Sequence, residues 1–186
     1  METNQAFSTD PSWPPEQARL IFFDTEFTAL VQDPFLISIG FASDDGSEFY
    51  GELEPRFWAP WASKFVQGNV VPQLDQVTHR AGGLPPFSLI ALAKAIREWL
   101  ERQSDLVVLV SDSPRYDLEV LLALFREVDE SWPSNTDKRV RCYSMDETAA
   151  LTYHREFKRI GLPQHHALAD AKALRAAWTA HDWRSD

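Results

Sequence analysis

Two acidic residues stand two positions apart at the end of an apolar stretch, in the segment Phe22-Phe23-Asp24-Thr25-Glu26-Phe27. Alternate side chains of a strand share one face, so Asp24 and Glu26 are expected to point to the same side. Two carboxylates held this close repel each other unless hard cations bind between them. The alternative is structural, with one acid capping a turn and the other solvated. The pair predicts a metal site only if further acids join it.

Asp117 and Asp170 are the candidates for these further acids. Asp117 falls in the first turn of a predicted helix, at the boundary of its buried stripe, and Asp170 lies among alanines and leucines in another. A charge in such surroundings needs a partner. The structural alternatives are a helix-dipole role for Asp117 and a salt bridge from Asp170 to Lys172 or Arg175. Asp112, just before the first of these helices, is expected to cap it or to lie in the loop.

Two histidines, His165 and His166, immediately precede the helix that carries Asp170. A histidine in such a place is more often structural. At a loop-to-helix junction five residues before an acid, however, it could exchange protons at a site that the acid helps to build. His166 and Asp170 are four residues apart and would share a helix face, whereas His165 lies outside it. The residues alone leave open which of the two histidines would act as a base.

The elements that must position these residues follow from apolar periodicity and turn signals. Residues 1–18, rich in proline and polar residues, are expected to form a flexible tail before a single domain of residues 19–186. Strands are predicted at residues 20–23, 36–43, 48–53, 106–110 and 140–143, and helices near 62–67, 88–100, 113–125, 144–161 and 167–181. Ser88, Pro114 and Gly161 mark helix ends, and Ser144 is expected to cap the helix after it. This order predicts an α/β domain in which helices flank one sheet.

Composition limits the class of protein. The chain of 186 residues has a net charge of −10, and its single cysteine, Cys142, excludes an internal disulfide and a multi-cysteine metal site. No apolar stretch approaches the roughly 20 residues of a membrane helix, and no signal-peptide pattern is present, so we expect a soluble cytoplasmic protein. The acidic balance disfavours unspecific nucleic-acid binding. Six Lys and Arg residues against three acids in residues 138–159 form either a local basic lip or a solvated helix face.

Taken together, these motifs resemble the DEDD superfamily of 3′-to-5′ exonucleases, in its histidine-type (DEDDh) branch. Asp24-Thr25-Glu26 resembles the first exonuclease motif, Tyr116-Asp117 the second, and the segment His165-His166-Ala167-Leu168-Ala169-Asp170-Ala171 the third, in the family's order. The resemblance implies a ribonuclease H-like fold, a mixed five-stranded sheet flanked by helices. Residues 36–41, followed by Asn69-Val70-Val71-Pro72, are more similar to compact exoribonucleases than to proofreading subunits.

The resemblance also implies a mechanism. Asp24, Glu26, Asp117 and Asp170 would hold two Mg2+ or Mn2+ ions, with Asp24 bridging both, and His165 would deprotonate the water that attacks the last phosphodiester. A nucleoside 5′-monophosphate would leave. General chemistry agrees, because paired metals roughly 3.5–4 Å apart stabilise the attacking and leaving oxygens, and histidine is a suitable base near neutral pH. Oxygen ligands favour Mg2+ or Mn2+ over Zn2+.

Substrate contacts are expected from three residues near the first motif. Leu30 would wedge against the terminal base, Phe27 would add stacking surface unless it is an ordinary core residue, and Thr25 would contact the substrate. Ala29 stands where glycine is common in the family, which leaves the local loop conformation open. The expected partner is a single-stranded 3′ end, RNA in preference to DNA, and the sequence leaves a homodimer open.

Three alternatives compete with this interpretation. A DNA 3′ exonuclease for proofreading or repair would use the same chemistry, because backbone groups can recognise a 2′-hydroxyl. A non-catalytic interaction module could keep the fold, although clustered, repelling carboxylates bring it little advantage. A phosphatase-like hydrolase would require a nucleophilic Asp-x-Asp where this chain has Asp24-Thr25-Glu26.

Overall fold

The computed structural model describes residues 6–10, 13–78, 85–103 and 106–180. One sheet runs through it, with strand order β1-β6-β5-β2-β3-β4. Its strands are β1 (Phe7–Ser8), β2 (Arg19–Phe27), β3 (Leu36–Ser43), β4 (Glu48–Glu52), β5 (Val107–Ser111) and β6 (Thr136–Cys142). β2, β3 and β4 pair antiparallel, whereas β5 pairs parallel with β2 and β6, and β1 pairs parallel with β6. The sheet is therefore mixed.

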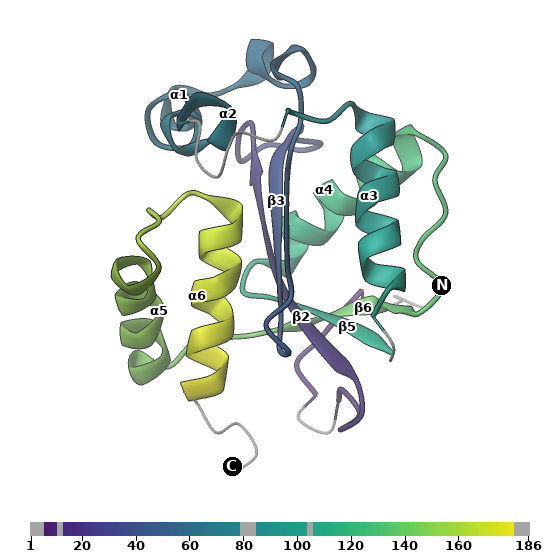
Figure 1. Cartoon of the computed structure of the whole chain (residues 1–186), viewed down its shortest axis with the longest axis vertical. Coiled ribbons are helices and arrows are strands. Elements are labelled where there is room, and N and C mark those ends of the chain that lie inside the picture. The colour runs from purple at the N-terminus through teal and green to yellow at the C-terminus, as the bar shows by residue number, and fades with distance from the viewer. Residues whose placement is uncertain (1–5, 11–12, 79–84, 104–105, 181–186) are drawn as a thin grey trace.

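Helices cover both faces of this sheet. They are α1 (Lys64–Asn69), α2 (Asp75–Thr78), α3 (Leu89–Glu101), α4 (Pro114–Glu127), α5 (Glu147–Ile160) and α6 (Ala167–Ala180), with short 3-10 turns at Pro55–Phe57, Ala59–Trp61 and Val71–Gln73. Figure 1 shows α5 and α6 on one side of the sheet and α3 and α4 on the other. Among the residues that the structure describes, no helix is both long and apolar enough to cross a lipid bilayer.

The N-terminal segment supplies a strand that the sequence did not predict. Phe7 and Ser8 of β1 lie opposite Val140 and Arg141 of β6. Trp13 is buried, with the guanidinium of Arg139 4.7 Å above its ring. An indole contributes a large apolar area on burial, which favours docking even in a proline-rich segment. The described part of the expected flexible tail thus packs on the domain, and the expected five strands become six.

The two faces of β2 pack on different helices. Ile21 and Phe23 belong to the core cluster beneath α3 and α4. Phe22 points the other way and meets Trp178 of α6 edge-on, with ring centroids 5.7 Å apart. Alternation then places the next even-numbered side chains, those of the two acids, on the α6 face. The strand continues through the acids to Phe27, because β3 remains paired with it along this length.

Helix α6 packs closely against strand β3. The buried residues of this helix are mostly alanines, which let its backbone come near the sheet. A Cβ atom added to Gly40 would lie 2.3 Å from the backbone N of Leu168. Only glycine leaves room for α6 at this point of β3, so Gly40 sets the position of the helix that carries Asp170.

The helix ends follow their predicted signals with one exception. Ser88 caps α3, Pro114 is the first residue of α4, and Gly161 ends α5 in the left-handed conformation with φ 68°. The predicted cap of α5 was wrong. Asp146, not Ser144, is the capping residue, and its carboxylate accepts a hydrogen bond from a backbone N–H of the first turn at 2.7 Å. Aspartate is as good an N-cap residue as serine. Which of the two residues caps α5 therefore depended on where the chain turns after β6.

Candidate active site

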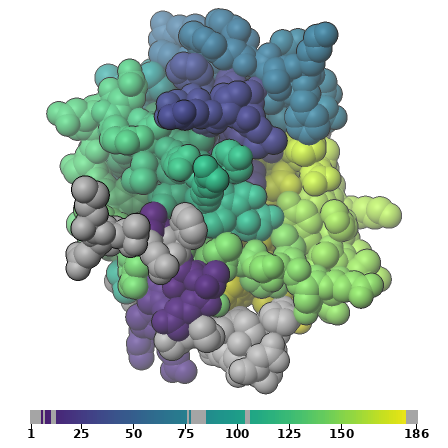
Figure 2. Space-filling view, turned by 180° about the vertical axis from the view of Figure 1, so that it is seen from behind, coloured from purple at the N-terminus to yellow at the C-terminus, as the bar shows by residue number. Residues whose placement is uncertain are grey.

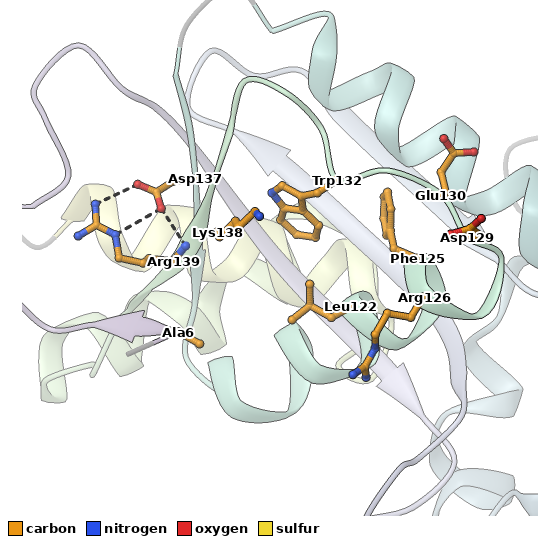
Figure 3. A pocket seen from close by; sticks show the side chains of 10 residues that line it. All are labelled: Ala6, Leu122, Phe125, Arg126, Asp129, Glu130, Trp132, Asp137, Lys138 and Arg139. Atoms are coloured by element: carbon orange, nitrogen blue, oxygen red, sulfur yellow. Dashed lines mark hydrogen bonds and ion pairs between the residues drawn. The ribbon is translucent and has the colours of Figure 1, made fainter. Parts of the chain in front are cut away.

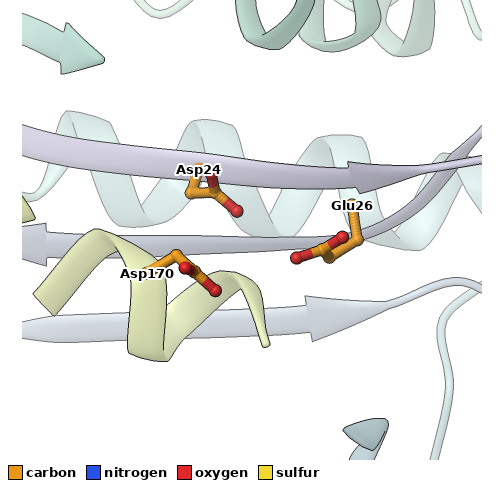
Figure 4. A group of neighbouring side chains, drawn as sticks. All are labelled: Asp24, Glu26 and Asp170. Atoms are coloured by element: carbon orange, nitrogen blue, oxygen red, sulfur yellow. The ribbon is translucent and has the colours of Figure 1, made fainter. Parts of the chain in front are cut away.

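Three of the four predicted acids lie together where α6 crosses β2. One carboxylate oxygen from each of Asp24, Glu26 and Asp170 lies within 4.8 Å of the other two (Figure 4). A second group with the same spacing comprises Asp24, Asp112 and Asp117. The two groups share Asp24. The strand, the start of α4 and the start of α6 therefore bring all four predicted acids to one place.

Asp117 is held by three hydrogen bonds from two neighbouring strands. Its Oδ1 accepts the backbone N–H of Thr25 at 3.1 Å and the Thr25 hydroxyl at 2.7 Å, and its Oδ2 accepts the Ser111 hydroxyl. The residue is only 1% exposed. Burial raises the pKa of Asp117 to about 7, because the three donors offset only part of the loss of hydration.

Asp170 is fixed in a similar way from α5 and from the turn before its own helix. Its carboxylate accepts the Tyr153 hydroxyl at 2.7 Å and the backbone N–H of His166 at 3.0 Å. Burial again raises its pKa, to about 6, against the effect of these donors. The orientation of this carboxylate is thus determined before any ligand binds.

The other two predicted acids, Asp24 and Glu26, have raised pKa values because the carboxylates lie close together and are buried. Burial, followed by the charges of Asp117 and Asp170, raises the pKa of Asp24 well above its usual range. Burial and the same two charges raise the pKa of Glu26. Like charges gathered at a site of low hydration are stabilised by a bound cation. Every donor in the two groups is a carboxylate oxygen, which is the ligand set that Mg2+ and Mn2+ prefer.

The two histidines lie in different surroundings. The His165 ring is half-buried and meets Phe65 of α1 edge-on at 5.3 Å, and burial lowers its pKa below the ordinary value. The His166 ring is 2% exposed, stacks on Tyr50 at 4.4 Å and has its Nε2 3.4 Å from Asp75. The His166 ring is therefore engaged by Tyr50 and Asp75, and the His165 ring by Phe65.

No protein-family model matches the sequence, and no curated protein matches it. The fold does have matches among solved structures. A structure of exonuclease I aligns with a TM-score of 0.54 at 13% identity, covering 90% of this chain and 42% of that chain. The zinc-bound E. coli ExoI–ssDNA complex aligns with a TM-score of 0.54 at 12% identity, covering 91% and 41%. The nuclease domain of 3′hExo, a DEDDh family member bound to rAMP, gives 0.53 at 13%, covering 88% and 90%.

This chain has the fold of the DEDDh exonucleases. The expected ribonuclease H-like mixed sheet is thereby confirmed, with β1 as an additional edge strand. The chain spans less than half the length of the exonuclease I chains and most of the 3′hExo nuclease domain. At such low identity the likeness establishes the fold alone, so the chemistry must be argued from the residues of this chain.

The three predicted substrate contacts differ in exposure. Leu30 is 76% exposed and free to meet a ligand. Phe27 is half-buried and stacks on Tyr116 at 5.6 Å, so it also supports the core. Thr25 does not fit the prediction, because it is 4% exposed and its hydroxyl donates to Asp117. The side chain of Thr25 holds a carboxylate instead of a substrate.

Two exposed aromatic rings lie where the segment that carries Leu30 meets residues 55–65. Figure 2 shows residues 28–35 beside residues 55–65 on one face of the molecule, and the backbone N–H of Ser63 donates to the carbonyl of Thr28 at 2.9 Å. Phe35 and Trp61 stack across this junction with centroids 4.4 Å apart. Together with Leu30 these exposed side chains form a surface on which bases could stack.

Sequence reasoning missed two residues of the site. Asp112 was assigned to a cap or loop, yet its carboxylate lies in the same group as Asp24 and Asp117. Its place directly after β5 was a usable signal, because ligands of α/β sheets gather at the carboxyl ends of parallel strands. Tyr153, which donates to Asp170, gave no such signal. Its role depends on how α5 packs against α6.

One cavity is lined by none of the acids of the candidate site. It measures about 700 Å3 and lies between α4 and β6, lined by Ala6, Leu122, Phe125, Arg126, Asp129, Glu130, Trp132, Asp137, Lys138 and Arg139 (Figure 3). Its basic side chains are accompanied by as many acidic ones, three of each. The cavity therefore gives no charge preference for a phosphate chain.

Proposed function

We propose that this protein is a metal-dependent 3′-to-5′ exonuclease that releases nucleoside 5′-monophosphates from single-stranded 3′ ends, with RNA favoured over DNA. The observation that carries the proposal is the pair of carboxylate groups that share Asp24. Two groups with one common ligand are what a two-metal phosphodiesterase requires. Residues 19–186 would form the catalytic domain, and the substrate would be met in the cytoplasm.

Asp24, Glu26, Asp117 and Asp170 would hold two Mg2+ or Mn2+ ions. When bound, the ions supply positive charge that stabilises the attacking and leaving oxygens of the phosphodiester. The chain itself contributes orientation, because donors from Thr25, Ser111 and Tyr153 fix two of the four carboxylates. Fixed ligands need no rearrangement during turnover.

His165 would accept a proton from the attacking water. Burial lowers the pKa of its imidazole, so the ring is neutral and able to accept a proton at neutral pH. It stands five residues before Asp170 in the sequence, at the turn before α6, and we do not assign it as a metal ligand. The ring contact with Phe65 limits the directions in which the imidazole can swing.

Leu30 and the rings of Phe35 and Trp61 would receive the terminal bases. Their exposure suits unpaired bases, which can stack on aromatic and apolar side chains, whereas a paired end would first have to unstack. The preference for RNA rests on the similarity to compact exoribonucleases. DNA is the second candidate, and the aligned ExoI structure with ssDNA favours it.

Matched RNA and DNA oligomers of one sequence separate these substrates. With Mg2+ present, we expect stepwise shortening from the 3′ end, nucleoside 5′-monophosphates identified by mass spectrometry, and RNA cut at least as fast as DNA. A strong DNA preference would move the protein to the repair alternative. Internal cleavage or 3′-monophosphate products would contradict the proposed chemistry.

A non-catalytic interaction module is the alternative from another class. Such a module would keep four acids whose pKa values are raised by burial and mutual repulsion, which destabilises the fold at neutral pH. An interaction surface gains nothing from this arrangement. Absence of any turnover on both oligomers, with metal bound, would favour the module.

A further inference from the structure

The ring of His166 is held on two sides by residues that are distant in sequence. It lies nearly parallel to the Tyr50 ring of β4, with centroids 4.4 Å apart and an angle of 20° between the planes. Its Nε2 lies 3.4 Å from Oδ1 of Asp75, the first residue of α2. The ring therefore joins the turn before α6 to both β4 and α2.

Glu52 closes this set of contacts. Its Oε1 accepts the Tyr50 hydroxyl at 2.6 Å and the backbone N–H of Asp75. The residue is buried, and both of these hydrogen bonds are partly buried. Tyr50, Glu52, Asp75 and His166 thus contact one another in a ring, and we name them the His166 cluster.

The His166 cluster acts on the residue next to it. His165 has φ 64°, a left-handed backbone conformation that residues other than glycine rarely adopt. Such a conformation persists only where the surrounding structure determines it. His166, anchored on one side of His165, also donates its backbone N–H to Asp170. The cluster is therefore attached to the candidate base and to a candidate metal ligand.

We propose that the His166 cluster is a positioning device for His165, in which Asp75 and Tyr50 hold the buried ring and the ring fixes the backbone of the preceding histidine. The proposal rests on the proposed function in one respect, namely that His165 is the general base. None of the four cluster residues needs to touch substrate. They act through the place that they give to His165.

Asp75→Asn tests this proposal, because it keeps the size of the side chain and removes the charge beside Nε2 of His166. Loss of a supporting contact of this kind is expected to lower kcat by about 10–100-fold, with KM nearly unchanged. In a His165→Ala background the same substitution should cause no further loss, since its effect passes through His165. If the role of Asp75 were purely structural, Asp75→Asn would lower kcat by the same factor with and without His165.

Tyr143→Phe is the matched control. The Tyr143 hydroxyl donates to the carbonyl of Ala177 at 3.2 Å, so the variant also removes a buried tyrosine hydrogen bond, but one outside the cluster. It should leave kcat unchanged. If Asp75→Asn does not fold, Tyr50→Phe takes its place, because it keeps the stacked ring and loses the hydrogen bond to Glu52. We then expect a smaller loss of kcat than for Asp75→Asn, and no loss in the His165→Ala background.

The NMR resonance of the His165 ring provides a test that does not depend on activity. The signal is identified by its absence in His165→Ala, and it should shift in Asp75→Asn but not in Tyr143→Phe. An unshifted signal, or equal losses of kcat in both backgrounds, would overturn the proposal. If the wild-type protein degrades no strand, the proposed function fails, and the ring resonance alone decides whether the cluster positions His165.

Discussion

At the scale of single residues, Asp24 and Asp170 differ in the hydrogen bonds that their carboxylates accept. Among the described residues none donates a hydrogen bond to Asp24, whereas Asp170 accepts two. Replacing either by asparagine should reduce turnover below detection, because a ligand charge is lost. In metal-free protein at pH 7, Asp24→Asn should raise the free energy of unfolding, since burial and the charges of Asp117 and Asp170 raise the pKa of Asp24. Urea unfolding measures this, and a larger gain for Asp170→Asn would contradict it.

The raised pKa values predict how stability depends on pH. Asp117 has a pKa of about 7 in the folded protein against 3.8 as the model value, and Asp170 one of about 6. A group whose pKa rises on folding stabilises the protein fully below its unfolded pKa and loses that contribution as pH rises through the folded pKa. Metal-free protein should therefore lose stability between about pH 4 and pH 7 from these groups.

Comparison with Asp117→Asn isolates this effect, because Asp45 and Asp137 have lowered pKa values and act in the opposite sense. The free energy of unfolding should fall less steeply with pH in the variant. Excess Mg2+ should restore wild-type stability near pH 7, since it binds the native site. Identical slopes for wild type and variant would contradict the assignment.

The two histidines predict different losses. His165→Ala should lower kcat by roughly 10²–10⁴-fold while Mg2+ affinity is kept, as expected for removal of a general base. His166→Ala should lower kcat less, but it should destabilise the fold, because its ring is buried against Tyr50. Steady-state kinetics and calorimetric metal titration measure both effects. The reverse ranking of kcat would identify His166 as the base.

Residue types and spacing were sufficient to single out four acids that the structure brings together. They were not sufficient to predict partners. Thr25 was predicted to face substrate, yet it donates to Asp117 across 92 positions of sequence. Asp112 was predicted to cap or line a loop, yet it joins Asp24. Such roles depend on which strands become neighbours, and no local pattern of residues records this.

At the scale of elements, the seating of α6 on β3 makes a prediction for Gly40. An alanine there would place its Cβ against the backbone of α6, which can move only as a whole. Overpacking of this kind should cost about 1–3 kcal/mol of unfolding free energy, and Mg2+ affinity should fall because Asp170 moves with the helix. Gly68→Ala, with no atom within 4 Å of its Cβ, is the control and should lose neither.

Element boundaries were predictable where apolar periodicity ends at a turn. The bounds of β3 agree with the prediction at both ends, because the strand is buried on both faces along its whole length. The apolar run predicted a strand over residues 20–23, but pairing with β3 extends β2 through Asp24 and Glu26. The apolar pattern ends at the two acids although the strand continues. β1 was missed because its pairing with β6 spans most of the chain.

At the scale of the whole molecule, charge predicts how substrate is held. Three of the six cations in residues 138–159 are engaged within the protein, Arg139 with Asp137, Arg159 with Glu156, and Arg141 with the carbonyl of Asp10. In a chain of charge −10 few phosphates can then be neutralised. Binding of a single strand is measured with the His165→Ala variant. The slope of log K against log salt should indicate about two or three phosphate contacts, at roughly 0.7 per contact.

Long and short strands should accordingly bind alike, and paired 3′ ends should resist degradation. Fluorescence anisotropy across a series of strand lengths and salt concentrations measures the affinity. An affinity that climbs steadily with length would show an extended binding groove, contrary to this distribution of charge.

Dependence of turnover on both a free 3′ end and a divalent metal tests the central claim most directly. Single strands with a free or a blocked 3′ end are incubated with wild-type protein and with Asp24→Asn, in Mg2+ or in excess EDTA, and shortening is followed on a gel. Stepwise shortening is predicted only for wild type, only with the free 3′ end and only with Mg2+. Activity of Asp24→Asn equal to that of wild type, or full activity in EDTA, would contradict a catalytic metal site built on Asp24.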